Sequence, residues 1–362
     1  MKHLDEYRDR ELAENLIRQI SGRVTRPWKI MEICGGQTHS IMKYGLHQLL
    51  PRSITLIHGP GCPVCVTPVS LIDMAIRLAR EQQVTLASFG DMLRVPGTGE
   101  DLLSAKAQGA DIRTVYSPLD SVSLAAKDPG REVVFFAVGF ETTAPAVALA
   151  VLEAAKKQLT NYSVLAAHVL VPPAIRALLS APDHSIDGFL AAGHVCTIMG
   201  YEQYIPIAEE FGIPMAVTGF EPVDLLLGIE TTVRMLEEGE TGVKNAYPRA
   251  VRKEGNTAAR KMMEKVFRTT DRTWRGMGII PESGLDLKPE YDAFNARKKY
   301  SLSDSHTEET GLCIAGEILS GRKKPVECPA FGTLCRPEKP LGAPMVSPEG
   351  ACAAYFRYAR TA

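Results

Sequence analysis

Long apolar runs are missing from this sequence of 362 residues. No stretch approaches the roughly 20 apolar residues that cross a bilayer, and the charged N-terminus is unlike a secretory leader. An excess of one charge is missing too, because 41 basic and 42 acidic residues leave a net charge of −1. No basic patch typical of nucleic-acid binding stands out. The sequence therefore predicts a cytoplasmic protein that binds neither a membrane nor nucleic acid.

Familiar nucleotide and hydrolase motifs are also absent. There is no P-loop, no G-x-G-x-x-G after a strand, and no motif for Ser-His-Asp hydrolysis. Aromatic residues make up only 7% of a chain whose hydrophobic content, 45%, is ordinary for a globular protein. What remains conspicuous is eight cysteines. In a reducing compartment these are not expected to be structural disulfides, so metal or redox chemistry is favoured.

Short apolar runs alternate with helical ones from about residue 27 to 230. Continuous apolar strands that alternate with helices indicate parallel sheets covered on both faces. The expected strands are residues 28–33, 53–59, 84–90, 111–117, 132–140, 163–171, 186–193 and 214–220. The expected helices between them include residues 69–83, 144–158 and 224–239.

A Pro-Gly break at residues 125–132 leaves four of these strands on either side. The triplet Gly-Phe-Glu also recurs, at residues 139–141 and 219–221. We therefore predict an α/β protein with two similar small parallel-sheet domains, residues 25–128 and 129–245.

The two ends of the chain differ from this pattern. An N-terminal helix within residues 1–24 is expected to pack on the first domain or on the C-terminal part. Residues 246–362 begin with a charged helix at 249–268 and then become Gly/Pro-rich, with little apolar periodicity. We expect a third, mostly helical or irregular domain there, for which a bound metal supplies the missing folding energy.

The first candidate site is Cys34, in the run CGGQTH that follows the expected strand 28–33. Loops at the carboxyl ends of parallel strands line ligand crevices, and two glycines allow a close backbone approach. A helix that begins at this cysteine favours its thiolate, which makes it a better metal ligand or nucleophile. His39 could add a ligand or accept a proton. The alternative is a tight turn with an inert thiol and a structural histidine.

Cys62 and Cys65 form a C-x-x-C motif in the loop after the next expected strand. This spacing lets two thiols share a metal or form a reversible disulfide. No second C-x-x-C completes a zinc ribbon, so a redox dithiol is the better interpretation. If the two strands are neighbours, Cys34, Cys62 and Cys65 converge on one crevice.

Four further cysteines lie near the C-terminus, with 14, 6 and 16 residues between them: Cys313, Cys328, Cys335 and Cys352. Four thiolates suit a [4Fe–4S] cluster or a tetrahedral zinc ion. The spacing matches neither a ferredoxin nor a zinc ribbon, and we favour the iron–sulfur cluster. Cys196 is interpreted as a small buried hydrophobe.

Several other polar residues fall where strands are expected to end: Asp91, Glu141, His168, His194 and Glu221. Each could act as an acid, a base or a substrate contact in a crevice. Each could equally cap a helix or fill a structural role.

Taken together, these motifs resemble one family, the hydrogenase maturation protein HypD. The resemblance spans nearly the whole chain and rests on residues 34–39, 58–68, 89–97, 139–146, 168–175, 192–195, 219–226 and 328–358. It implies a scaffold that assembles the Fe(CN)2CO unit of [NiFe] hydrogenases together with the small chaperone HypC. Cyanide would arrive transiently from HypE, which carries it as a thiocyanate on a terminal cysteine.

The resemblance also assigns roles to the cysteines. It implies that Cys34 binds the iron together with a HypC cysteine, and that Cys62 and Cys65 are a redox pair beside it. The four C-terminal cysteines would hold a [4Fe–4S] cluster, in an arrangement similar to that of ferredoxin:thioredoxin reductase. Many relatives carry another histidine where this chain has Gln37, so no histidine role beyond His39 is implied in that loop.

Two alternatives remain open from the residues themselves. One is a stand-alone iron–sulfur-dependent disulfide reductase that uses Cys62 and Cys65 and does not need Cys34. The other is a zinc-stabilised ligand-binding module without redox function.

Overall fold

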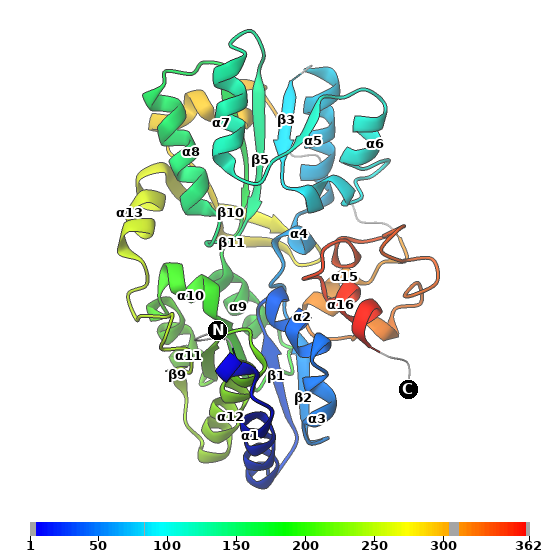
Figure 1. Cartoon of the computed structure of the whole chain (residues 1–362), viewed down its shortest axis with the longest axis vertical. Coiled ribbons are helices and arrows are strands. Elements are labelled where there is room, and N and C mark those ends of the chain that lie inside the picture. Colours follow the sequence, from blue (N-terminus) through cyan, green and yellow to red (C-terminus); the bar gives the residue numbers. More distant parts are fainter. Residues whose placement is uncertain (1–4, 83, 304–310, 360–362) are drawn as a thin grey trace.

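The computed structural model describes residues 5–82, 84–303 and 311–359 (Figure 1). The described strands form two parallel sheets and one antiparallel hairpin. The five-stranded sheet has the order β2-β1-β7-β8-β9, with β2 Ile54–His58, β1 Trp28–Glu32, β7 Gly188–Ala192, β8 Pro214–Thr218 and β9 Gly242–Asn245. The four-stranded sheet has the order β4-β3-β5-β6, with β4 Ile112–Thr114, β3 Thr85–Ser88, β5 Val133–Gly139 and β6 Tyr162–His168.

Helices connect and cover these strands. The α-helices are α1 Arg10–Arg23, α2 Gly35–Lys43, α3 Leu46–Leu49, α4 Pro63–Val66, α5 Val69–Glu81, α6 Leu102–Ala107, α7 Pro118–Lys127, α8 Ala144–Lys156, α9 Val171–Ser180, α10 Gly193–Met199, α11 Ile205–Phe211, α12 Pro222–Glu238, α13 Thr257–Val266, α14 Ala296–Lys299, α15 Ala315–Leu319 and α16 Ala351–Tyr358. Short 3-10 helices are η1 Asp5–Arg8, η2 Gly90–Arg94, η3 Glu202–Tyr204, η4 Pro289–Phe294, η5 Pro325–Glu327 and η6 Ala343–Met345. Within the described ranges, no helix combines the length and the apolarity that crossing a membrane requires.

The predicted fold class is confirmed, but the predicted grouping of strands is wrong. The five-stranded sheet takes its strands from residues 28–58 and 188–245, whereas the four-stranded sheet uses residues 85–168. Predicted boundaries at 25–128 and 129–245 therefore cut across both sheets. The Pro-Gly loop at 125–132 lies within the four-stranded unit, between α7 and β5. Apolar runs mark strands, but they do not encode which strands pair, and crossover connections can reach either sheet.

The region after residue 245 contains a hairpin that the sequence did not reveal. Strands β10 (Phe267–Trp274) and β11 (Gly278–Leu287) pair antiparallel, with a register irregularity between Thr270 and Arg272. The expected helix at 249–268 is shorter, since α13 covers only Thr257–Val266, with irregular backbone before it and β10 after it. In Figure 1 this hairpin lies between the two parallel sheets. Its Trp274 packs against Phe140, which directly follows β5.

The helix α1 packs against α12 of the five-stranded unit. Its apolar face contributes Leu16 and Ile20, both buried, to the core formed with β1, β2 and α12. The indole of Trp28 donates a hydrogen bond to Glu237, which ties the start of β1 to the same helix. The N-terminal helix thus belongs to the unit that carries β1.

The carboxyl ends of strands from both sheets contribute to one apolar cluster. It contains Ile33 and Cys34 after β1, Phe140 after β5, Val169 after β6 and Val195 after β7. Because ligand sites in parallel α/β sheets lie at the carboxyl ends of strands, this shared cluster is where a site is expected.

We predict that Asn161→Ala destabilises the four-stranded unit. The buried Asn161 amide donates hydrogen bonds to the carbonyls of Ala125, Asp128 and Arg131, which fix the loop before β5. Leaving these carbonyls without a donor should lower the free energy of unfolding by about 1–3 kcal/mol. Urea unfolding of the variant measures this, and a loss below about 0.5 kcal/mol would contradict it.

Candidate metal and thiol site

Cys34 lies where β1 ends and α2 begins. Its backbone is extended, and its carbonyl accepts hydrogen bonds from the N–H groups of Gln37 and Thr38 in the first turn of α2. Close packing requires the first of the two glycines that follow. A side chain at Gly35 would meet the backbone oxygen of Glu349 at 2.3 Å. The loop therefore admits the C-terminal segment directly against the cysteine.

Cys62 and Cys65 form a disulfide in the loop after β2. Cys62 caps α4, Pro63 starts the helix, and the N–H of Cys65 donates to the Cys62 sulfur at 3.2 Å. Pro63 suits the first helical position because its missing N–H would be unpaired there. Both cysteines are buried, at 2% and 0% exposure.

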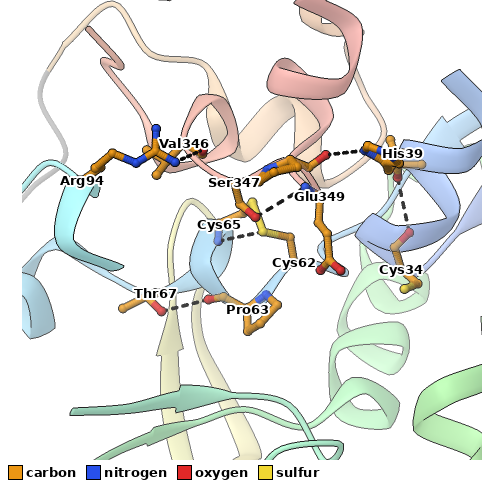
Figure 2. Close-up of a disulfide and its surroundings, with 12 residues drawn as sticks. Cys34, His39, Cys62, Pro63, Cys65, Thr67, Arg94, Val346, Ser347 and Glu349 are labelled. Atoms are coloured by element: carbon orange, nitrogen blue, oxygen red, sulfur yellow. Dashed lines mark hydrogen bonds between the residues drawn. A yellow bond between two sulfur atoms is a disulfide. The ribbon is translucent and has the colours of Figure 1, made fainter. Parts of the chain in front are cut away.

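The Cys34 loop and the disulfide loop adjoin because β1 and β2 are neighbours in the sheet (Figure 2). Gly35 N–H donates to the Gly61 carbonyl at 2.9 Å. A side chain at Gly61 would overlap the Ile33 carbonyl and the Cys34 Cα, at 2.1 and 2.4 Å. Three sulfur atoms from neighbouring strand ends are thus gathered in one part of the core.

His194 places an imidazole ring beside the Cys34 thiol. It lies on α10, directly after β7, and β7 is the other neighbour of β1. The Cys34 Sγ lies 3.5 Å from His194 Nδ1 and 3.9 Å from Nε2. Burial lowers the pKa of His194 to about 4, so its ring is neutral at physiological pH. A neutral imidazole beside a thiol is a suitable ligand pair for a transition metal.

The helix N-terminus was expected to favour the Cys34 thiolate, but opposing effects also act on the pKa of Cys34. The N–H groups of Gln37 and Gly36 do lower the pKa of Cys34. Burial works against them and, with the negative charge of Glu349, raises the pKa to about 12. The thiol is therefore neutral at physiological pH, and binding a metal as a thiolate must release its proton.

Glu349 is a site residue that the strand-end argument missed. It precedes α16 in the C-terminal segment, and in Figure 2 its carboxylate lies between the disulfide and Cys34. Burial raises its pKa, and the charge of Asp91 adds to the effect. The only sequence signal was its place in the run SPEGACAAYFRY, because it follows no strand.

His39 does not share this place. Its Nδ1 lies 3.1 Å from the carbonyl oxygen of Pro348, and its Nε2 lies 3.5 Å from the Tyr358 hydroxyl. The ring also makes an edge-on contact with Tyr358. The side chain that was expected to support the redox pair instead contacts the C-terminal segment.

The remaining strand-end candidates have separate environments. Asp91 is partly exposed and lies 3.5 Å from Arg94, which also donates to the Val346 carbonyl. Glu221 caps α12 and binds Arg8, an arrangement that matches the structural alternative. His168 is buried, and burial lowers its pKa to about 3.

Glu141 and Cys196 are both buried beside the thiol site. Glu141 accepts a hydrogen bond from the N–H of Val171, and burial raises its pKa to about 7. Cys196 belongs to the same apolar cluster as Cys34, and burial raises its pKa. Its environment agrees with the interpretation as a buried hydrophobe.

The four C-terminal cysteines line one apolar cavity. It lies within the C-terminal segment, and its walls include Ile314, Ile318, Phe331 and Met345 beside Cys313, Cys328, Cys335 and Cys352. The N–H of Leu341 donates to the Cys335 sulfur at 3.3 Å. Burial and the other thiols of the set raise the pKa of Cys352. In the described residues, no three His, Cys, Asp or Glu side chains are grouped closely enough to hold one metal ion.

The chain is thus an α/β protein with two parallel sheets and two groups of cysteines. One group lies in loops at neighbouring strand ends, and the other lines a separate cavity. Comparison with known proteins identifies its family. The HypD family model, described as "Hydrogenase formation hypA family", matches residues 11–359. The chain belongs to the HypD family.

Relatives named as hydrogenase maturation factors are similar over almost their full length. HypD2 of Bradyrhizobium diazoefficiens is 48% identical, over 99% of this chain and 97% of its own. HypD of Rhizobium leguminosarum bv. viciae is 47% identical, over 99% and 96%. HypD of Escherichia coli K12 is 43% identical, over 99% and 98%. The predicted family resemblance is confirmed.

We predict that Gly61→Ala separates the two sulfur loops. Its new Cβ would overlap backbone atoms of the Cys34 loop, and forced overpacking costs about 1–3 kcal/mol of unfolding free energy. Urea unfolding measures the loss. Gly99→Ala is the matched control, because no atom lies within 4 Å of its Cβ position. Equal stability of the two variants would contradict the prediction.

We predict that Glu349→Gln lowers the pKa of Cys34. The carboxylate is ionised in the alkaline range where Cys34 titrates, and a nearby negative charge disfavours a thiolate. Removing it should move the onset of Cys34 alkylation, followed by mass spectrometry, to lower pH. The control is Glu338→Gln, an exposed carboxylate of the same segment. An unchanged or higher onset in the Glu349 variant would refute this.

Proposed function

We propose that this protein is a hydrogenase maturation factor that serves as the scaffold on which the Fe(CN)2CO unit of [NiFe] hydrogenase is assembled. Iron is the cargo in this proposal. Cys34 would bind it together with a cysteine of HypC, and HypE would deliver cyanide transiently. The observation that carries the proposal is the contact of Cys34 with His194 beside the Cys62–Cys65 disulfide.

The residues around Cys34 suit such a metal. Soft thiolates and imidazoles bind iron, and the low-spin iron that cyanide and carbon monoxide favour is well matched to sulfur ligands. The neighbouring imidazole is neutral, so it needs no deprotonation. Because Cys34 is only 2% exposed, we expect the loops around it to open when HypC binds.

Cyanide transfer from a thiocyanate requires two electrons. The S–C bond breaks, the carrier sulfur leaves as a thiolate, and cyanide binds the iron as an anion. Oxidation of the Cys62 and Cys65 thiols to their disulfide yields two electrons and two protons, which balances the step. The disulfide is then the state that follows one transfer.

Restoring the dithiol needs an electron source. Both sulfurs are buried, so exchange with a thiol from outside would require an opening. A stand-alone reductase would need the same opening for its dithiol to reach a substrate disulfide. An internal source is therefore favoured.

The four-cysteine cavity supports a [4Fe–4S] cluster as that source. Its donor set is four thiols, its other walls are apolar, and Cys335 receives a backbone N–H. Hydrogen bonds to the sulfurs and exclusion of solvent are features that tune such clusters. When bound, the cluster would supply single electrons from a low-potential one-electron carrier. Cys313, Cys328, Cys335 and Cys352 would hold it.

Metal analysis tests the cluster. Protein purified under strict anaerobiosis should be brown and contain about four iron and four sulfide per chain. Cys335→Ala and Cys352→Ala should lose the visible absorbance, whereas Cys196→Ala, a matched buried cysteine outside the set, should keep it. Colourless protein that contains zinc would instead support the zinc-stabilised module.

Maturation of a hydrogenase in cells that lack their own HypD tests the role of Cys34. Because the proposed iron ligand is lost, Cys34→Ala should reduce hydrogenase activity by at least about 100-fold while the cluster absorbance stays unchanged. Cys62→Ala/Cys65→Ala should also abolish maturation. Full maturation by the Cys34 variant would eliminate the scaffold and favour the reductase.

A further inference from the structure

We propose that a buried polar chain, Glu32–His58–Tyr355, positions the C-terminal helix α16 against the two sulfur loops. The proposal rests on the function above, because it concerns how the four-cysteine segment is aligned with the dithiol. It assigns positioning roles to three residues that the family motifs alone leave without one.

The chain runs through the core from one segment to the next. His58 Nδ1 contacts Glu32 Oε1, and Thr38 of α2 donates its hydroxyl to the same oxygen at 2.9 Å. His58 Nε2 lies 2.9 Å from the Tyr355 hydroxyl. The rings of His58 and Tyr355 meet edge-on at 5.1 Å. Glu32, His58 and Tyr355 are all buried.

The direction of the hydrogen bonds follows from chemistry. Burial raises the pKa of Tyr355, so its hydroxyl keeps its proton and donates to Nε2. Nδ1 of His58 then serves as the donor to the Glu32 carboxylate. One carboxylate thereby orients a histidine, and the histidine accepts the hydroxyl of Tyr355.

Each link belongs to an element of the proposed mechanism. Glu32 is the last residue of β1, two before Cys34, and His58 is the last residue of β2, before the disulfide loop. Their strands pair in register, Glu32 opposite His58. Tyr355 lies one turn after Cys352 on α16, and Glu349 lies two residues before the start of that helix. The Tyr355 hydroxyl therefore fixes a helix that carries one of the four cavity cysteines and follows Glu349 in the chain.

The other contacts that hold α16 are mainly apolar, against α2, η5 and η6 and between the rings of Phe331 and Phe356. A small apolar cluster joins Met42 of α2 to Ala354 and Tyr355. One turn further on, the Tyr358 hydroxyl contacts His39 at 3.5 Å, a long and partly exposed contact. Figure 1 shows α16 beside α2, where this contact surface lies.

Stability alone does not account for a polar chain at this position. Glu32 Oε2 has no hydrogen-bond partner among the described residues. A buried carboxylate with an unpaired oxygen costs free energy, and apolar residues of similar size often stabilise a core better. Polar groups in cores are best attested as devices that select one arrangement of neighbouring elements.

Tyr355→Phe tests the proposal, with Tyr358→Phe as the matched control. Both remove one hydroxyl from α16 and keep the ring, but only Tyr355 belongs to the buried chain. Hydrogen exchange of the α16 amides in the full-length protein should accelerate roughly tenfold in Tyr355→Phe and stay unchanged in the control.

A second measurement follows the dithiol directly. A photoreduced deazaflavin supplies single electrons to the anaerobic protein, and a mass-tagging alkylator traps the thiols. Two electrons and two protons from water convert the Cys62–Cys65 disulfide into two thiols. The rate should fall at least about tenfold in Tyr355→Phe, since a misplacement of about 1 Å can cost on the order of 100-fold in rate. The visible spectrum of the cluster should not change.

The outcomes separate the two proposals. If Tyr355→Phe only lowers the melting temperature, with exchange and reduction rates equal to the control, the positioning role is wrong while the scaffold function stands. If the unaltered protein holds no cluster, the proposed electron source fails, and hydrogen exchange alone still decides whether Tyr355 fixes α16.

Discussion

The site depends on how closely three backbone segments approach one another. Where β1 and β2 end, Gly61 leaves room for the Ile33 carbonyl and the Cys34 Cα, and Gly35 leaves room for the backbone of Glu349. A side chain at Gly61 or Gly35 would overlap these backbone atoms and force the segments apart. The sulfurs of Cys34, Cys62 and Cys65 gather because their loops have no side chains at the points of contact. Glycine at these contacts is therefore what allows the sulfur-bearing loops to adjoin.

Burial determines the protonation states of Cys34 and His194 in this site. It favours the uncharged forms, so Cys34 keeps its proton and His194 lacks one. A neutral pair is compatible with the apolar cluster around it, whereas an unpaired thiolate would be costly. A divalent cation reverses this balance, because it attracts the thiolate that burial disfavours. The Cys34–His194 pair is thus uncharged as it stands, and under the proposed function it would gain charge only when iron binds.

Part of this arrangement could be predicted from the sequence, and part could not. Eight apolar runs identified eight strands of the two sheets, and the βα loops after them identified the cysteines. Strand order was not encoded, because most of these runs are buried on both faces and resemble one another as pairing partners. For this reason Asp91, Glu221 and His194 were equivalent candidates, although only His194 follows a strand that pairs with β1. Glu349 was hidden because it enters the site from a segment without a strand.

The C-terminal segment shows why the position of α16 and the chemistry of its cysteines are linked. Its own apolar cluster is small, with Ile318, Ala330, Met345 and Ala351 packed around Cys335 and Cys352. So few apolar side chains contribute little folding energy, and the sulfurs themselves form part of that core. Under the proposed function a bound cluster would hold the segment from within, while contacts with the sheet hold it from outside. The buried bond of Tyr355 to His58 is such an outside contact, and it reaches the end of the strand that precedes the disulfide. The cavity cysteine Cys352 and the contact with β2 are therefore separated by one turn of α16.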